Sequence, residues 1–344
     1  MSSTKEAHVA FVVVDVPDPH PARGRRLAAA HPELRQLFGR NPWTAALVAG
    51  LVALQLGVAA ALGWTAAPWW AVLAAAWLVG AFVDHALFAA MHDAAHGLVF
   101  RRRWANDLVV VLANTPMLVP FGFPFAYWHL EHHRHQGDPA RDPDLPAPWE
   151  LRVFPEGFVG KLAWHVSFVG LQVFRTHAGG PSIREPRVAA HALFALAVAA
   201  VITVGLGPAA LGYLVASLYF VYSLHPLAGR FVQEHHLMPG APVQETASYV
   251  GPLNLVSLNF GLHTEHHDFP AVPWNRLPAI RRIAPEGYAD RQVHRSWTAL
   301  WLRFLFEPGL SHASRAIRVS PAHRTAAGSG DQRLEPPEVL HEPG

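Results

Sequence analysis

Three histidine-rich stretches, HDAAH at residues 92–96, HLEHH at residues 129–133 and HTEHH at residues 263–267, set the strongest constraint on how this chain folds. In a helix, histidines spaced by three or four residues lie on one face. The three stretches present eight imidazoles, and His235 between the second and third is a ninth candidate. Because eight ligands exceed what one four- to six-coordinate ion accepts, the pattern predicts that the stretches meet at a site for two metal ions.

The candidate metal ligands are His92, His96, His129, His132, His133, His235, His263, His266 and His267. Five carboxylates lie among them, and we expect these to accept the second ring N–H of ligand histidines and so to fix their orientation, with direct ligation left open. They are Asp93, Glu131, Glu234, Glu265 and Asp268. His85 and His225 remain open between a functional and a structural role. We expect no role for His8, His20, His31, His177, His191 and the histidines after residue 310.

The composition favours a membrane protein and limits the chemistry of the metal site. Hydrophobic residues make up 51% of the 344 residues and charged residues 15%, which is apolar-rich for a water-soluble domain. The chain has no cysteine, which excludes disulfides, iron–sulfur clusters, thiolate-bound zinc and a cysteine nucleophile. A metal must therefore be held by nitrogen and oxygen.

Four apolar runs, at residues 43–64, 68–90, 188–206 and 209–225, are long enough to cross a bilayer. The short linkers inside each pair carry no Lys or Arg, whereas Arg101, Arg102 and Arg103 follow the first histidine stretch directly. By the positive-inside rule, this asymmetry places all three histidine stretches on the cytoplasmic side. The predicted fold is an all-α integral membrane protein, with four transmembrane helices in two hairpins and a cytoplasmic, histidine-rich cap that binds two metals.

The remaining segments divide the chain into three regions. Residues 104–128 are apolar but contain Pro116, Pro120 and Pro124, which predicts a re-entrant or interfacial segment, because a full crossing would separate the first two histidine stretches. Residues 158–174 read as an amphipathic surface helix. We expect an N-terminal cytoplasmic region at 1–41 with a short helix at 32–38, a catalytic membrane domain at 42–310 and a disordered tail at 311–344.

The donor set fits a pair of oxygen-activating irons, although imidazoles also accept zinc. Apolar spans beside such a site predict a lipid substrate. A membrane zinc metalloprotease is a weak alternative, because Asp93 stands where HExxH has its catalytic glutamate and two histidine stretches would have no role. A metal transporter is also weak, because nearly all these histidines lie outside the apolar runs.

The HxxxH, HxxHH and HxxHH pattern resembles the membrane fatty-acid desaturase and hydroxylase superfamily. From about residue 11 to 316 the chain resembles the sphingolipid Δ4-desaturases, or dihydroceramide desaturases. The most specific stretches are DPHPARGRRLAAAHPELRQLF at 18–38, LHPLAGRFVQEH at 224–235, ETASYVGPLNL at 245–255 and HHDFP at 266–270. The chain departs from that family at Asp93, commonly Glu, at Thr264, commonly Asn, and at Arg230, often His.

The resemblance implies a di-iron centre bound by the nine histidines, with O2 as co-substrate. The implied reaction places a trans Δ4 double bond in the sphingoid base of dihydroceramide and gives ceramide. Electrons would come from a separate protein of the cytochrome b5 or ferredoxin type, and the implied location is a bacterial inner membrane or the endoplasmic reticulum. No nucleic acid is implied as a partner. A sphingolipid C4-hydroxylase and a fatty acyl desaturase remain open as alternatives within the superfamily.

Overall fold

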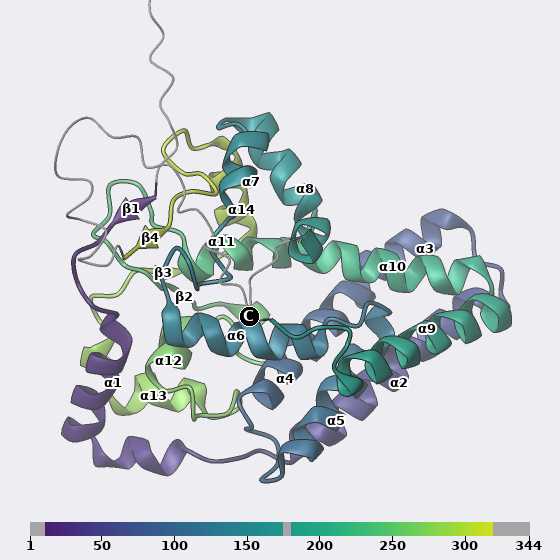
Figure 1. Cartoon of the computed structure of the whole chain (residues 1–344), viewed down its shortest axis with the longest axis horizontal. Coiled ribbons are helices and arrows are strands. Elements are labelled where there is room, and N and C mark those ends of the chain that lie inside the picture. Colours follow the sequence, from purple (N-terminus) through teal and green to yellow (C-terminus); the bar gives the residue numbers. More distant parts are fainter. Residues whose placement is uncertain (1–10, 175–179, 319–344) are drawn as a thin grey trace, which may run out of the picture.

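The computed structural model describes residues 11–174 and 180–318, and most of these are helical (Figure 1). Among the described residues, four helices are long and apolar enough to cross a membrane: Trp43–Trp64, Trp69–Ala95, Pro186–Leu206 and Pro208–His235. The first is α2, the third is α9, and the other two are composite. Trp69–Ala95 comprises α3 (Trp69–Ala75), a π-helical turn (Ala76–Gly80) and α4 (Ala81–Ala95), and Pro208–His235 begins with α10 (Pro208–Tyr222).

These helices confirm the predicted two-hairpin membrane fold. In Figure 1, α2, α3, α9 and α10 form an elongated arm at one side of the molecule. Only 22% of the most apolar window is buried inside the protein for Trp43–Trp64 and for Pro186–Leu206, so most of each surface is free to face lipid. Trp43 and Trp64 are 81% and 78% exposed at the two ends of α2, where the membrane interface favours tryptophan.

The second and fourth spans approach each other closely at a glycine. A Cβ atom added to Gly80 would lie 1.9 Å from Ser217 Oγ and 2.7 Å from Ser217 Cβ, so only glycine permits this packing. The contact aligns α4, which carries the first histidine stretch, with α10.

The proline-rich segment folds as two helices joined by a sharp bend. Helix α5 (Arg103–Asn114) and the 3₁₀ turn Thr115–Met117 meet α6 (Gly122–His135) at 117°. Pro116 lies in that turn and Pro120 in the linker, as expected for residues that cannot continue a helix. Because both α5 and α6 pack against α4, the bend brings the second histidine stretch beside the first.

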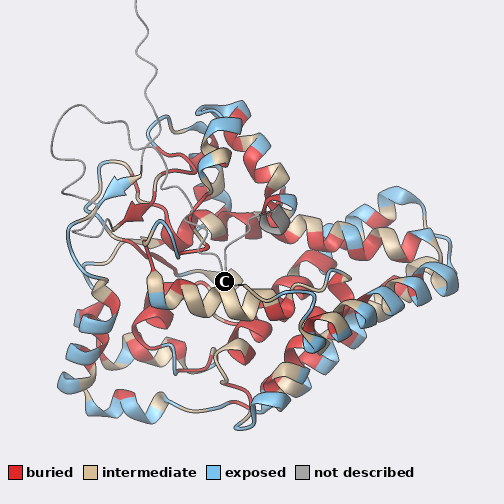
Figure 2. Ribbon diagram, viewed as in Figure 1, coloured by how far each residue is buried: buried red, intermediate tan, exposed pale blue. Residues whose placement is uncertain are grey.

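The cap lies at the end of the spans opposite to the arm's tip, and most of its elements are short (Figure 1). Its helices are α1 (Pro19–Ala30), α7 (Pro148–Val153), α8 (Phe158–Phe174), α11 (Arg230–His235), α12 (His263–Asp268), α13 (Leu277–Ile283) and α14 (Trp297–Phe306). Its 3₁₀ turns are Pro32–Leu37, Pro226–Gly229, Pro252–Leu255 and Pro285–Gly287. Two short parallel strand pairs complete it, β1 (Val12–Val13) with β4 (Ala316–Ile317) and β2 (Ser248–Tyr249) with β3 (Val293–His294). Figure 2 shows buried segments concentrated inside the cap and where it meets the spans.

The prediction of a disordered tail from residue 311 is wrong for residues 311–318. Ala313 and Ile317 are buried, β4 pairs with β1, and the Arg318 backbone N–H donates to Gly137 O at 2.7 Å. The composition of this stretch is polar, but its order depends on a strand about 300 residues earlier, which composition cannot reveal. The rest of the predicted tail lies outside the described residues, and so do His8 and His177 elsewhere in the chain.

Candidate metal centre

The nine histidines predicted as metal ligands come from four helices that meet where the spans reach the cap (Figure 1). The end of α4 carries His92, and His96 follows as its C-terminal capping residue. Helix α6 carries the second stretch and α12 the third, while His235 ends α11. All six residues of α12 are buried, so its three histidines face protein rather than solvent.

Five histidines form a first group, called cluster one here: His92, His96, His129, His133 and His266. Each offers one ring nitrogen, and these nitrogens all lie within 4.8 Å of one another. The Nε2 atom of His129 is 2.9 Å from that of His96 and 3.0 Å from that of His133. The Nε2 atoms of His133 and His266 are also 3.0 Å apart, so all three stretches contribute to this cluster.

Cluster two consists of His132, His235 and His267, whose ring nitrogens also lie within 4.8 Å of one another. His263 adjoins it, because its Nε2 atom is 2.9 Å from that of His235. The two clusters are neighbours, since the ring of His133 in cluster one stacks on that of His267 with centroids 4.2 Å apart.

The arrangement fits bound metal ions. The Nε2 atoms of His92, His132 and His267 are buried and have no hydrogen-bond partner among the described residues. Burying a polar nitrogen without a partner is unfavourable, and so is bringing the lone pairs of two imidazoles together. A cation at each cluster satisfies both requirements, and neutral imidazole is a ligand for Fe, Zn, Cu and Ni.

The electrostatic environment keeps the α12 imidazoles uncharged. Burial is the largest cause that lowers the pKa of His263, His266 and His267 well below the usual 6.5, and repulsion from neighbouring groups that can carry a positive charge adds to the effect. Only the neutral ring can bind a metal, so these shifts favour metal binding near neutral pH.

Cluster two has outer hydrogen bonds that orient its imidazoles. Asp142 Oδ1 lies 2.8 Å from His132 Nδ1, and Asp142 is itself fixed by the backbone N–H groups of Gly137 at 2.7 Å and Asp144 at 3.0 Å. The Nδ1 atom of His235 is 3.1 Å from the carbonyl oxygen of Glu245. With Nδ1 engaged in this way, Nε2 of each ring is directed to the cluster.

Sequence reasoning missed Asp142, which is the acid that actually contacts a predicted ligand. The loop after the second histidine stretch, RHQGDPARDPDLPAPWE, contains three aspartates only a few residues beyond it. That proximity is a usable signal, although it does not tell which aspartate turns back to α6.

The predicted carboxylates bind other groups, so the hydrogen-bonding role assigned to them is not found among the described residues. Asp93 accepts from the backbone N–H of Trp274 at 3.0 Å, and its Oδ1 is 3.7 Å from His92 Nδ1, too far for a hydrogen bond. Glu131 pairs with Arg134 on the outer side of α6. Glu234 pairs with Arg230 at 2.7 Å, and Glu265 contacts Ser248 and Arg281.

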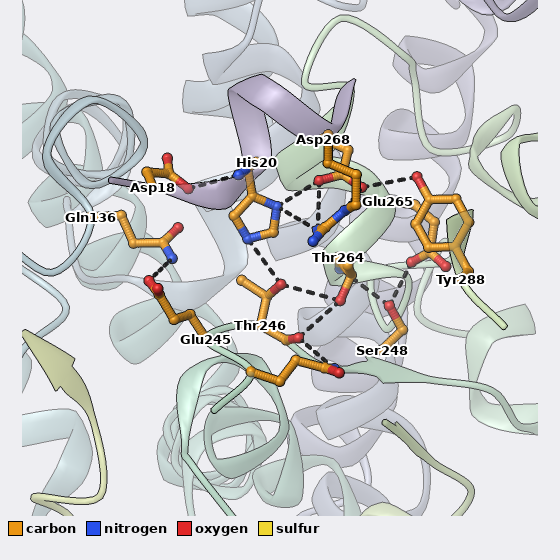
Figure 3. A network of polar contacts seen from close by, with 12 residues as sticks. Asp18, His20, Gln136, Glu245, Thr246, Ser248, Thr264, Glu265, Asp268 and Tyr288 are labelled. Atoms are coloured by element: carbon orange, nitrogen blue, oxygen red, sulfur yellow. Dashed lines mark hydrogen bonds and ion pairs between the residues drawn. The ribbon is translucent and has the colours of Figure 1, made fainter. Parts of the chain in front are cut away.

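Asp268 binds the N-terminal segment instead of a predicted ligand (Figure 3). Its Oδ1 lies 2.6 Å from His20 Nδ1, and Arg23 donates to both of its oxygens at 2.7 Å. Tyr288 donates to Oδ2 at 3.0 Å. Gly24 permits this docking of α1, because a Cβ there would lie 2.4 Å from Asp268 O.

The expectation that His20 has no role is therefore wrong. His20 is 2% exposed, and its Nε2 lies 3.0 Å from Thr246 Oγ1 (Figure 3). Its ring is 5.0 Å from that of His267. The N-terminal helix thus supports α12 directly behind cluster two. Nothing local in the sequence indicates a contact between residues about 250 positions apart.

Apart from these nine, the histidines of residues 11–174 and 180–318 lie outside both clusters. His225 is structural, because it accepts from the Leu227 backbone N–H at 3.2 Å and its Nε2 lies 3.0 Å from Trp77 O. His85 is buried against the rings of Phe260 and Trp297, and neither of its nitrogens has a hydrogen-bond partner among the described residues.

Comparisons with a protein-family model and with individual proteins all point to desaturases. A family model described as fatty acid desaturase matches residues 67–299. The chain is 35% identical to the sphingolipid delta(4)-desaturase DES1 of Drosophila melanogaster, over 91% of this chain and 97% of that protein. It is 36% identical to the sphingolipid delta(4)-desaturase of Candida albicans, over 86% and 84% of the two chains. It is 33% identical to the sphingolipid delta(4)-desaturase/C4-monooxygenase DES2 of Bos taurus, over 90% and 95%.

Proposed function

The chain belongs to the fatty acid desaturase family, and we propose that it is an O2-dependent di-iron desaturase that introduces a trans Δ4 double bond into the sphingoid base of dihydroceramide. The observation that carries the proposal is the pair of adjacent histidine clusters at the ends of apolar spans. The names of its relatives from Drosophila melanogaster and Candida albicans support the sphingolipid substrate.

We assign the metal ligands as the sequence predicted them. Cluster one would hold one iron, and cluster two together with His263 would hold the other. When bound, the two irons supply the redox chemistry that activates O2 for attack on an unactivated C–H bond.

The protein itself would hold the metals, orient their ligands and shield the site from water. Neutral imidazoles hold the metals, and Asp142 keeps His132 in the ligating orientation. Phe260, with its ring 5.0 Å from that of His92, and Phe125, which stacks on His129, provide an apolar wall that limits access of water. In the overall balance, the lipid loses two hydrogens, a donor gives two electrons, and with two protons one O2 becomes two waters.

We place the clusters on the cytoplasmic side of the membrane, where a separate electron-transfer protein of the cytochrome b5 or ferredoxin type would reach them. Arg101, Arg102 and Arg103 are exposed immediately after the first histidine stretch. The linkers at the other ends of the spans carry no Lys or Arg. This asymmetry supports the orientation by the positive-inside rule.

Hydroxylation at C4 is a second candidate, because the relative from Bos taurus, whose name carries both activities, is nearly as similar as those named only as desaturases. Both outcomes begin with removal of one hydrogen from the lipid. In hydroxylation one oxygen atom enters the product and one water is formed, whereas desaturation removes a second hydrogen and leaves two waters.

Mass spectrometry of sphingolipids tests the proposal. A host that accumulates dihydroceramide would express either the protein or its His266→Ala variant, together with a cytochrome b5 or ferredoxin electron-transfer chain. A ceramide lighter by two hydrogens, with a C4–C5 bond located by fragmentation and absent with the variant, is the expected product. A product heavier by one oxygen would favour the C4-hydroxylase, and unsaturation only in ordinary fatty acyl chains would contradict the sphingolipid assignment.

A further inference from the structure

Arg230 has two buried hydrogen-bond donors that the protein does not use. It begins α11, in the composite helix Pro208–His235, at the point where the fourth span reaches the cap. The residue is 2% exposed, and its Nη1 donates to Glu234 Oε1 at 2.7 Å. Its Nε and Nη2 atoms have no hydrogen-bond partner among the described residues. A buried guanidinium with free N–H groups requires an acceptor from elsewhere.

Aromatic rings surround these free donors and connect them to cluster one. The guanidinium carbon lies 4.0 Å from the ring centroid of Phe231 and 4.9 Å from those of Phe88 and Phe260. The ring of Phe260 is in turn 5.0 Å from that of His92. Arg230 therefore lies one aromatic ring away from a proposed metal ligand, in surroundings that suit a lipid.

The free edge of Arg230 defines the chemistry of its ligand. The Nε–H and Nη2–H bonds of a guanidinium point in the same direction and match two oxygens in one plane. Glu234 already balances the positive charge, so a carboxylate or phosphate would leave an excess buried negative charge. A pair of neutral oxygens, such as a hydroxyl and an amide carbonyl, meets both conditions.

We infer that Arg230 binds the 3-hydroxyl and the amide carbonyl of the sphingoid substrate and so positions its C4–C5 bond at the metal clusters. The inference rests on the proposed function and adds a specificity residue to it. In a dihydroceramide the 3-hydroxyl is on the carbon directly next to C4. Its polar end must therefore lie beside the metals, which is where Arg230 lies, whereas a substrate that reacts in mid-chain would have its polar end much farther away.

The test compares two lipids in lipid nanodiscs, an N-acyl sphinganine and the same molecule without its 3-hydroxyl. Wild type is expected to prefer the hydroxylated lipid about 10- to 100-fold in kcat/KM, the value of a hydrogen bond to a charged group. Arg230→Met should lose this preference by lowering kcat/KM for the hydroxylated lipid alone. Arg230→Lys, which keeps the charge but not the planar fork, should retain only part of it.

Arg303 provides a matched control. It pairs with Glu307 at the same i, i+4 spacing, but its side chain is 41% exposed, so Arg303→Met should keep the wild-type preference. If Arg230→Met loses its metal, the double variant Arg230→Met/Glu234→Gln removes the unpaired charge and repeats the comparison.

Each result bears on a different claim. An unchanged preference in the folded Arg230 variants, or no preference in wild type, would overturn the inference and leave the desaturase assignment intact. If wild type converts acyl lipids but no sphingolipid, the proposed function fails. Thermal-shift binding of the same two lipids then decides the inference, which fails if the hydroxylated lipid stabilises wild type no more than the other.

Discussion

Cluster one is supported by long helices and aromatic rings, whereas cluster two is supported by hydrogen bonds from loops and from an N-terminal helix. In cluster one, Phe260 packs against His92 and Phe125 stacks on His129 with ring centroids 5.4 Å apart. In cluster two, the outer nitrogens of His132 and His235 contact Asp142 Oδ1 and Glu245 O. The same histidine stretches thus contribute ligands to two sites, and the residues that hold those ligands in place differ between the sites.

The difference teaches that the two sites respond to different changes. The geometry of cluster one follows from helix packing, which is maintained by many contacts, so no single contact decides it. The geometry of cluster two depends on a few polar contacts, and removing the orienting partner of a metal ligand weakens metal binding even though every ligand remains. Metal binding at cluster two should therefore be weakened by changes in residues that are not ligands themselves.

Loss of a metal ligand should have the largest effect on activity. The effect should be the same whether the ligand belongs to cluster one or to cluster two. His92→Ala removes a cluster-one nitrogen and His132→Ala a cluster-two nitrogen. Because the proposed chemistry needs both irons, each variant should fall below detectable turnover and retain about one iron per chain instead of two. Product analysis and elemental analysis of the purified variants measure the two quantities.

The control for this pair is His31→Ala, because His31 lies outside both clusters and contacts Glu286. It should keep both irons and full activity. Turnover by iron-loaded His132→Ala would show that cluster two is not needed and would remove the basis of the comparison.

Loss of the Asp142 carboxylate should weaken cluster two selectively. Asp142→Ala frees His132 Nδ1, and the loss of such an orienting partner typically costs about 10- to 100-fold in metal affinity or activity. Asp142→Asn should cost less, since its amide oxygen can still accept from the imidazole. Chelator competition should show one of the two irons released more easily and the other unchanged.

Asp138→Ala is the matched control in the same loop, because Asp138 contacts only the backbone N–H of Ala140 among the described side-chain hydrogen bonds. If both variants release both irons equally, the loop acts on the whole cap rather than on cluster two.

The elements that support cluster one were the ones predictable from the sequence. The run 43–64 is uncharged and ends in tryptophans, and α2 is Trp43–Trp64. Pro116, Pro120 and Pro124 predicted a break, and the chain bends by 117° around the first two, whereas Pro124 lies in the first turn of α6. These features follow from length, hydropathy and local backbone chemistry, which a sequence displays directly.

The supports of cluster two were not predictable in this way. His20 contacts Asp268, and β1 pairs with β4 across about 300 residues. Such contacts depend on how distant segments pack, and no local periodicity marks them. The acids next to the histidines in sequence were natural candidates, but on a helix a neighbouring residue points away from the ligand face, and Glu131 indeed pairs with Arg134 instead.

A lower pH should destabilise the metal-free protein through both clusters together, because α12 supplies His266 to one and His267 to the other. Burial lowers the pKa of both imidazoles, so below about 6.5 the unfolded chain takes up protons that the folded chain does not. The metal-free protein should therefore lose up to about 1.4 kcal/mol of stability per pH unit for each such histidine as the pH falls below 6.5. Thermal unfolding of metal-free protein between pH 7.5 and pH 5 measures this, and an apparent Tm that rises over that fall in pH would contradict it.

The smallest effect should come from three residues at the end of the described chain. A chain that ends at Arg315 lacks β4 and Arg318, whereas one that ends at Arg318 keeps both. Arg318 donates to Gln136 O at 2.9 Å and pairs with Glu245, whose carbonyl oxygen contacts His235. Of the contacts that the shorter chain loses, the one to Glu245 bears most directly on cluster two. One such contact is worth about 1 kcal/mol, so the shorter chain should bind the cluster-two iron about fivefold more weakly and the cluster-one iron unchanged. Because the two chains differ only at 316–318, equal release of iron in chelator competition would show that the packing of α11 and α12 alone positions His235. The hydrogen bonds from the chain end would then not belong among the supports of cluster two.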